Sequence, residues 1–232
     1  MAQQTTLPCG EFPQSSQEVP RHPSHSAPYP PGTRAPWGLF LGVALLAGCA
    51  QAGTQGLIAP TAWREDVQDP GVVETYAVER YAVAGQTMQA VRQGIEALGP
   101  VVNGQHFAGR THYDIHYEYN VLGNSERCAL ADLHVRLDLR VLLPEFTEAS
   151  GPTFTDYMQG LTRHEDGHVR VDRHIASALR QAIRAVPPQP DCTAMQAAIR
   201  QAGKETLESG NALNVQYDTL TNHGLTQGAA NQ

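Results

Sequence analysis

The stretch LADLHVRLDLRVLLPEF, residues 130–146, decides the fold class of this chain. Apolar and polar residues alternate along it, and successive side chains of a β-strand point to opposite faces. The stretch therefore predicts a strand with one buried face and one face in water. The buried face would comprise Leu133, Val135, Leu137, Leu139 and Val141, and the wet face His134, Arg136, Asp138 and Arg140.

The residues before this strand predict the rest of a small sheet. The segment GRTHYDIHYEYNV at 109–121 alternates in the same way, and LGNSER at 122–127 fits a hairpin loop. A looser alternation at 73–83 indicates another strand, and apolar residues at helical spacing predict a helix at 88–98. Because a hairpin joins the two clearest strands, we expect the sheet to be antiparallel.

The residues after the strand predict helices. Beyond Pro144 the apolar residues recur every three or four positions, which indicates a long helix at 154–186 and a second helix at 192–213. The remaining tail is polar, contains glycines and is expected to lack regular structure. The predicted fold class is therefore α+β, with a small antiparallel sheet packed against a long helix and a second C-terminal helix.

The N-terminal part differs in composition from this domain. Residues 1–48 are rich in Pro and Ser and end in the apolar run WGLFLGVALLAGC, which is shorter than the roughly 20 residues needed to span a bilayer. This run suits a secretory signal, and LAGC at 46–49 resembles the lipobox of bacterial lipoproteins, which implies lipidation of Cys49. We therefore expect a leader at 1–48, a flexible tether at 49–72 and a domain at 73–232. An uncleaved N-terminal anchor is the alternative.

Charge and cysteine content limit the partners and the compartment. The formal net charge is −7 and there is no cluster of Lys and Arg, so nucleic acid is not an expected partner. Of the four cysteines, Cys9 lies in the leader and Cys49 is the expected lipidation site. In an exported domain the remaining two, Cys128 and Cys192, are expected to form a disulfide. Two separate buried thiols would be the expectation for a cytosolic protein.

The long helix carries a candidate metal site. His164, Glu165 and His168 form the pattern H-E-x-x-H, in which two histidines one turn apart bind zinc and the glutamate is a general base. Both histidines fall on the predicted apolar stripe of the helix, so they would face the interior. The stripe comprises Tyr157, Leu161, His164, His168, Val171, Ile175, Leu179 and Ala182.

A third metal ligand must come from elsewhere in the chain. His174 is expected on the opposite, solvated side of the helix, beside Arg170 and Arg173, so it is not an expected ligand. Glu205 and Glu208 on the second helix are candidates, but both equally suit a solvated helix face. His223 in the tail has no packing role that the sequence explains, and imidazole is a preferred zinc ligand. We therefore favour His223.

Several motifs together resemble a family of uncharacterised bacterial domains described as predicted secreted zinc-dependent proteases. These motifs are YAVAGQT at 81–87, LGPVVNGQHFAGRT at 98–111, LPEF at 143–146, HEDGH at 164–168 and YDTLTNHGLTQGA at 217–229. The resemblance implies export and a peptidase-like zinc site, and it supports His223 as the third ligand. The Tyr and Asp of the family motif match Tyr217 and Asp218.

These observations lead to a functional hypothesis. The chain would be a lipid-anchored zinc metallopeptidase of the bacterial cell envelope, acting on a peptide or protein, with Zn²⁺ held by His164, His168 and His223. Glu165 would be the general base, Tyr217 would donate a hydrogen bond to the oxyanion, and Asp218 would orient a ligand histidine. Tyr217 and Asp218 would otherwise belong to an ordinary turn. Two alternatives remain: a zinc-binding interaction module without activity, and an amidase acting on cell-wall crosslinks.

Overall fold

The computed structural model describes residues 61–102 and 104–229. The leader at 1–48 and the expected lipidation site Cys49 lie outside the described residues. The elements, in chain order, are η1 (Ala62–Arg64), β1 (Val72–Val83), α1 (Met88–Leu98), β2 (Val101–Val102), β3 (Gln105–His106), β4 (Arg110–Gly123), β5 (Cys128–Phe146), α2 (Pro152–Arg184), α3 (Cys192–Thr221) and η2 (Leu225–Gln227).

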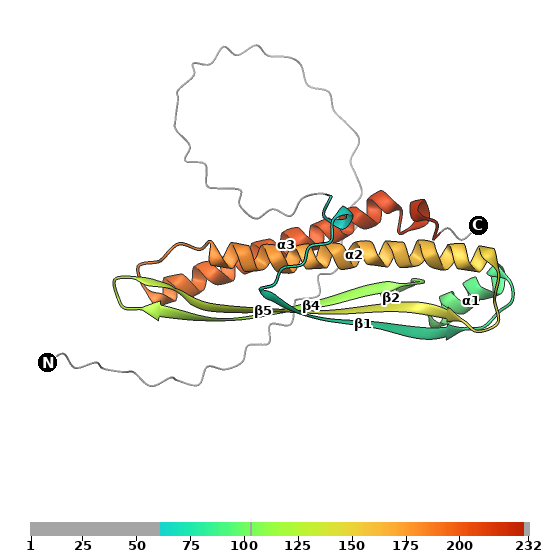
Figure 1. Cartoon of the computed structure of the whole chain (residues 1–232), viewed down its shortest axis with the longest axis horizontal. Helices are drawn as coiled ribbons and strands as arrows, with labels where there is room; N and C mark the ends of the chain where they lie inside the picture. The colour runs from blue at the N-terminus through green and yellow to red at the C-terminus, as the bar shows by residue number, and fades with distance from the viewer. Residues whose placement is uncertain (1–60, 103, 230–232) are drawn as a thin grey trace, which may run out of the picture. The chain divides into compact units, whose positions relative to one another are not determined.

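A three-stranded sheet in the order β1-β5-β4 forms one layer of the domain (Figure 1). Strands β4 and β5 pair antiparallel through a hairpin, as their alternation and the loop between them predicted. Strand β1 pairs parallel to β5, so the sheet is mixed and the expectation of a wholly antiparallel sheet is wrong. Alternation along a strand shows which face is buried, but it does not show which neighbour the strand joins or in which direction.

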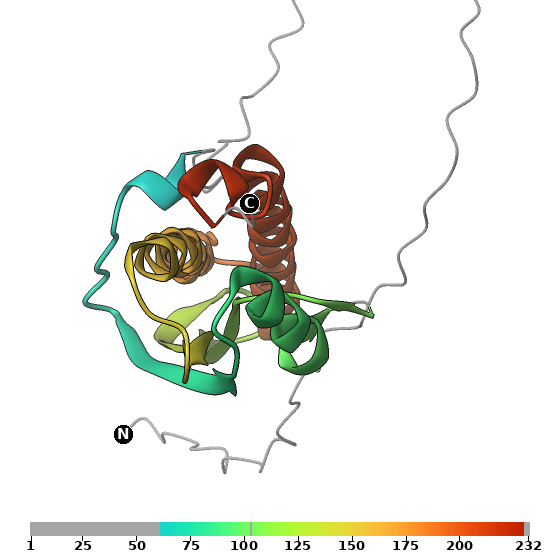
Figure 2. The same ribbon diagram turned by 90° about the vertical axis from the view of Figure 1, so that its right-hand side faces the viewer.

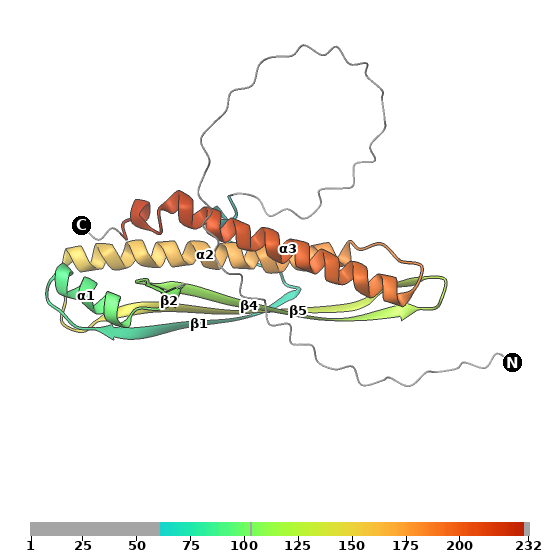
Figure 3. The ribbon, with the colours of Figure 1, turned by 180° about the vertical axis from the view of Figure 1, so that it is seen from behind.

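Helices α2 and α3 lie on one face of the sheet (Figures 1 and 3), which confirms the predicted α+β class. All five apolar positions of the inward face of β5 are buried, and they pack against the apolar side of α2. Arg136 and Arg140 stand on the other face of β5 and remain exposed. The alternation in β5 and the stripe on α2 therefore identify the same buried layer from both sides.

Residues 61–71, which we call the strap, run along the side of α2 that is turned away from β4 (Figure 2). Asp66 in the strap pairs with Arg173 of α2 at 2.7 Å, and Asp69 pairs with Arg180 at 3.2 Å. Arg170 donates a hydrogen bond to the backbone carbonyl of Trp63. The sequence analysis included these residues in a flexible tether, but here they cover a side of α2 that was expected to face water.

A disulfide joins Cys128 at the start of β5 to Cys192 at the start of α3, and it confirms the predicted pairing. Both cysteines belong to an apolar cluster with Met195 and Ile199 of α3. The bond therefore ties the first turn of α3 to the sheet. No helix in the described part of the chain is long and apolar enough to cross a membrane.

Replacing both Cys128 and Cys192 with Ala should lower the free energy of unfolding by about 2–5 kcal/mol, the usual cost of losing a native disulfide. Urea denaturation of the wild-type and the double variant, both without reductant, measures the difference. Two free thiols in the unfolded, unreduced wild-type protein would contradict the assignment, as would equal unfolding midpoints for the two proteins.

Candidate metal centre

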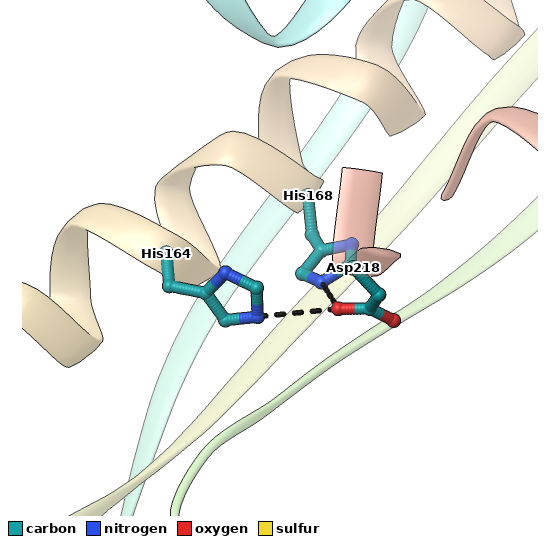
Figure 4. A group of neighbouring side chains, drawn as sticks. All are labelled: His164, His168 and Asp218. Carbon is teal, nitrogen blue, oxygen red and sulfur yellow. Dashed lines mark hydrogen bonds and ion pairs between the residues drawn. The ribbon is translucent and has the colours of Figure 1, made fainter. Parts of the chain in front are cut away.

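Two histidines of α2 form the centre of the candidate site. His164 and His168 stand one helical turn apart, and their ring centroids are 4.8 Å from each other. Both point from α2 toward α3, as Figure 4 shows, and His164 is only 5% exposed. Residues four positions apart lie on the same face of a helix, so the regularity of α2 is enough to bring the two rings together.

Asp218 of α3 supplies the third group. Its Oδ1 atom lies 3.3 Å from His164 Nε2 and 3.0 Å from His168 Nε2 (Figure 4). Among the described residues, these three side chains are the ones whose possible ligand atoms all lie within 4.8 Å of one another. The sequence analysis placed Asp218 in an irregular tail as an orienting residue. Because α3 continues to Thr221, Asp218 is a helical residue that faces α2 directly.

The electrostatics of this group favour a cation between its three members. Partial burial opposes ionisation of Asp218, but hydrogen bonds from His164 and His168 hold its pKa well below the usual range. Burial alone would lower the pKa of His168, yet the hydrogen bond and charge of Asp218 raise it to about 9. The three side chains therefore stabilise positive charge at the point where they meet.

The donor set and its spacing fit zinc. Zinc is bound in proteins by imidazole nitrogen and carboxylate oxygen, with tetrahedral geometry and metal–ligand distances of about 2.0–2.2 Å. Two ligands of such an ion are separated by about 3.3 Å. The separations of Asp218 Oδ1 from His164 Nε2 and His168 Nε2, 3.3 and 3.0 Å, agree with that value. The three ligand atoms all lie within 4.8 Å of one another, so the residues present are of a kind and spacing that could hold a zinc ion.

The Glu165 carboxyl group lies beside Thr111, at the start of β4. The side chain is nearly enclosed, with the residue 3% exposed, and Thr111 Oγ1 donates a hydrogen bond to Glu165 Oε2 at 2.7 Å. A Cβ atom at Gly109 would lie 2.6 Å from Glu165 Oε1, so this glycine leaves the space that the carboxyl group occupies. Burial raises the pKa of Glu165 above its ordinary value. The carboxyl group is held in one place and retains a proton more readily than an exposed one.

Tyr217 is fully buried between α2 and α3. Its ring stacks on His164 with centroids 5.2 Å apart, and its hydroxyl donates to the backbone carbonyl of His164 at 3.0 Å. Gln227 Nε2 donates to the same hydroxyl at 3.0 Å. In this arrangement the hydroxyl already has partners, so the predicted hydrogen bond to an oxyanion would require Tyr217 to leave them.

His223 lies at the rim of the site, just after α3 ends. Its Nδ1 atom is 3.6 Å from Asp218 Oδ1, and its side chain is 60% exposed. Asn222, His223 and Gly224 all have positive φ angles, a backbone form that turns the chain sharply after a helix. His223 stands outside the group of three but within reach of it. Its predicted role as a ligand therefore stays a prediction.

The other candidate ligands lie apart from this centre. Glu205 accepts a hydrogen bond from Gln201, and Glu208 pairs with Lys204 on the exposed face of α3. His174 is not in the group, as expected, but it is not fully solvated either. Its Nε2 atom is buried and has no hydrogen-bond partner among the described residues.

Several polar residues around the site were not predicted from the sequence. Asn214 and Gln227 contact the Nδ1 atoms of the two histidines, and Asp172 is buried behind Asn214. Burial raises the pKa of Asp172 to about 7. The sequence does contain a signal that α3 extends this far, because the buried residues Leu213, Tyr217 and Thr221 recur every four positions. Asn214 and Asp218 directly follow the first two of them and therefore lie on nearly the same side of the helix.

Comparisons with known proteins give a family but no activity. A family model described as "Bacterial protein of unknown function (DUF922)" matches residues 78–224, which include His164, His168, Asp218 and His223. No curated protein and no solved structure matches the chain. A functional assignment must therefore rest on the site.

Proposed function

The chain belongs to this family of bacterial proteins of unknown function, and we propose that it is a zinc-dependent metallopeptidase of the cell envelope. The observation that carries the proposal is the meeting of His164 Nε2, His168 Nε2 and Asp218 Oδ1 beside an enclosed glutamate. A helix that only needed to pack would gain nothing from two imidazoles, a carboxylate and Glu165 in one place, because burying such groups is unfavourable unless they are paired.

Each residue of the site has a separate role in this proposal. His164, His168 and Asp218 would hold the ion, with the rim at His223 as the side open to solvent and substrate. Zinc, when bound in such a site, lowers the pKa of a coordinated water and polarises a carbonyl group. Glu165 would accept a proton from the attacking water and return it to the leaving amine. The hydrogen bond from Thr111 orients its carboxyl group, and burial brings its pKa nearer to neutral pH.

The cellular location is part of the proposal. A disulfide between Cys128 and Cys192 suits an oxidising compartment outside the cytoplasm. Lipidation of Cys49, which lies outside the described residues, would attach the protein to a membrane, the outer one where the cell has two. Peptides or proteins of the envelope are the proposed substrates, and nucleic acid is not a proposed partner.

A specific feature favours one rival function, that of a zinc-binding interaction module without activity. Structural zinc sites have four protein ligands and no open position. His223 Nδ1 is 3.6 Å from Asp218 Oδ1, so a modest movement of this exposed side chain would allow it to join His164, His168 and Asp218 around one ion. A centre closed in this way would leave no position for water, and Glu165 would then be a structural partner of Thr111.

Alanine variants at positions 218 and 223 distinguish the two arrangements. Asp218→Ala should weaken zinc binding strongly, because Asp218 Oδ1 is the atom closest to both histidine Nε2 atoms. His223→Ala should bind zinc with a smaller loss if His223 only borders the open position. Isothermal titration with a competing chelator measures both affinities. If His223→Ala loses the metal and Asp218→Ala keeps it, the sequence-based ligand set is right and Asp218 is an orienting residue.

The function itself is tested by incubating the zinc-loaded protein with a broad peptide library that includes cell-wall crosslink peptides. The proposal expects cleavage that stops when a chelator removes the metal and resumes when zinc is restored. Cleavage confined to the cell-wall crosslinks would identify an amidase instead. Zinc retained at one ion per chain without cleavage of any library member would favour the interaction module.

A further inference from the structure

We propose that Asn214 and Gln227 are positioning residues that hold His168 and His164 with the proton on Nδ1, so that both Nε2 lone pairs face Asp218. This inference rests on the proposed metal site. It concerns the side of each imidazole that does not meet the metal, and it assigns a role to two carboxamides, one on α3 and one on η2.

The evidence for Asn214 is a chain of two hydrogen bonds. Asn214 Oδ1 lies 2.9 Å from His168 Nδ1, and Asn214 Nδ2 donates to Asp172 Oδ1 at 2.8 Å. A carboxamide has one end that accepts and one end that donates. Because the nitrogen end of Asn214 donates to Asp172 Oδ1, its oxygen end faces the histidine. His168 Nδ1 then carries a proton and donates it to that oxygen.

The evidence for Gln227 is a matching arrangement on the other ring. Gln227 Oε1 lies 3.1 Å from His164 Nδ1, while Gln227 Nε2 donates to the hydroxyl of Tyr217 at 3.0 Å. The hydroxyl of Tyr217 in turn donates to the carbonyl of His164 at 3.0 Å, which is closer than its other acceptor, Gln227 Oε1, at 3.2 Å. Thr221 Oγ1 is a second, longer neighbour of His164 Nδ1 at 3.4 Å. His164 is therefore held in the same tautomer, with a partial substitute for Gln227 nearby.

The consequence is a pair of imidazoles prepared to bind a cation. A neutral histidine protonated on Nδ1 presents only a lone pair at Nε2. Where Nε2 donates to Asp218 Oδ1 in the metal-free protein, at 3.0–3.3 Å, a bound cation takes the place of that proton, and the lone pairs and the oxygen then converge on the cation. Hydrogen-bond partners of this kind fix ring orientation and raise ligand basicity, and their loss typically weakens metal affinity by about 10–100-fold.

The test compares two asparagines of α3. Asn214→Leu removes the acceptor at His168, and it should weaken zinc binding by about 10–100-fold in a chelator competition assay. Asn211→Leu is the matched control, because Asn211 lies one turn earlier and accepts a single hydrogen bond, from Tyr113. Gln227→Leu should have a smaller effect than Asn214→Leu, since Thr221 remains beside His164.

Nitrogen NMR of the zinc-loaded wild-type protein tests the inference without any variant. We expect His164 and His168 to be protonated at Nδ1 and bound to metal through Nε2. Metal bound through Nδ1, or equal affinity in Asn214→Leu and Asn211→Leu, would overturn the inference while leaving the metal site intact. Failure of the wild-type protein to bind zinc would instead refute the proposed function on which the inference rests.

Discussion

Replacing Glu165 with Gln should leave zinc bound and remove hydrolytic activity. Gln has nearly the same shape and can still accept a hydrogen bond from Thr111, which now donates to Glu165 Oε2 at 2.7 Å. It cannot accept a proton, and general-base catalysis contributes about 10²–10⁴-fold to the rate. We therefore expect kcat/KM to fall by at least that factor on any substrate found in the library assay.

The matched control for this substitution is Glu208→Gln. Glu208 is an exposed glutamate on α3 that pairs with Lys204, so its neutralisation should leave both zinc content and activity unchanged. Because Glu165 is not among the three converging groups, its substitution should lower zinc affinity little. If Glu165→Gln releases zinc or unfolds the domain, Glu165 is a ligand or a structural partner, and the interaction module becomes the better account.

Replacing His168 with Ala should abolish zinc binding. Its Nε2 atom lies closest to Asp218 Oδ1, at 3.0 Å, and alanine leaves that carboxylate with the buried imidazole of His164 and the exposed one of His223 at the rim. His164→Ala should have the same effect, with an added loss of stability because His164 is buried against Tyr217. Metal content after gel filtration measures the result. Since zinc that binds the folded state raises its stability, the thermal midpoint of the wild-type should rise on adding zinc and that of either variant should not.

His174→Ala is the control for both histidine variants. His174 lies on the same helix but outside the converging group, and its Nε2 atom has no hydrogen-bond partner among the described residues. The variant should bind zinc as the wild-type protein does. Retention of zinc by His168→Ala, or its loss from His174→Ala alone, would mean that the metal is bound elsewhere on α2.

The parts of the fold that follow from local pattern could be predicted from the sequence. The alternation in β5 identified its buried residues, and LGNSER identified the hairpin to β4. The spacing on α2 placed His164 and His168 on one face, which a regular helix does without help from the rest of the chain. The disulfide followed from the two cysteines left over once Cys9 and Cys49 were assigned to the expected leader and lipidation site.

The parts that depend on distant contacts could not be predicted in this way. The parallel pairing of β1 with β5 joins segments that local alternation does not relate. The strap was predicted to be part of a flexible tether. Its ion pairs with Arg173 and Arg180 connect it to residues about a hundred positions away, so the local sequence does not reveal them.

The predicted third metal ligand depended on whether the C-terminal tail was taken as helical or irregular. Gly224 and Gly228 suggested that the whole tail was irregular, although α3 runs unbroken to Thr221. Treated as irregular, the tail offered His223 as a ligand and Asp218 as its support. Treated as a helix, it brings Asn214, Tyr217 and Asp218 onto the side that faces α2.

The most direct measurement is an anomalous difference map at the zinc absorption edge from crystals of the zinc-loaded protein. The account predicts one strong peak per chain at the point where His164 Nε2, His168 Nε2 and Asp218 Oδ1 meet. A map with no peak there, or with its peak at surface histidines such as His112, His116 and His134 on the outer face of the sheet, would contradict the central claim.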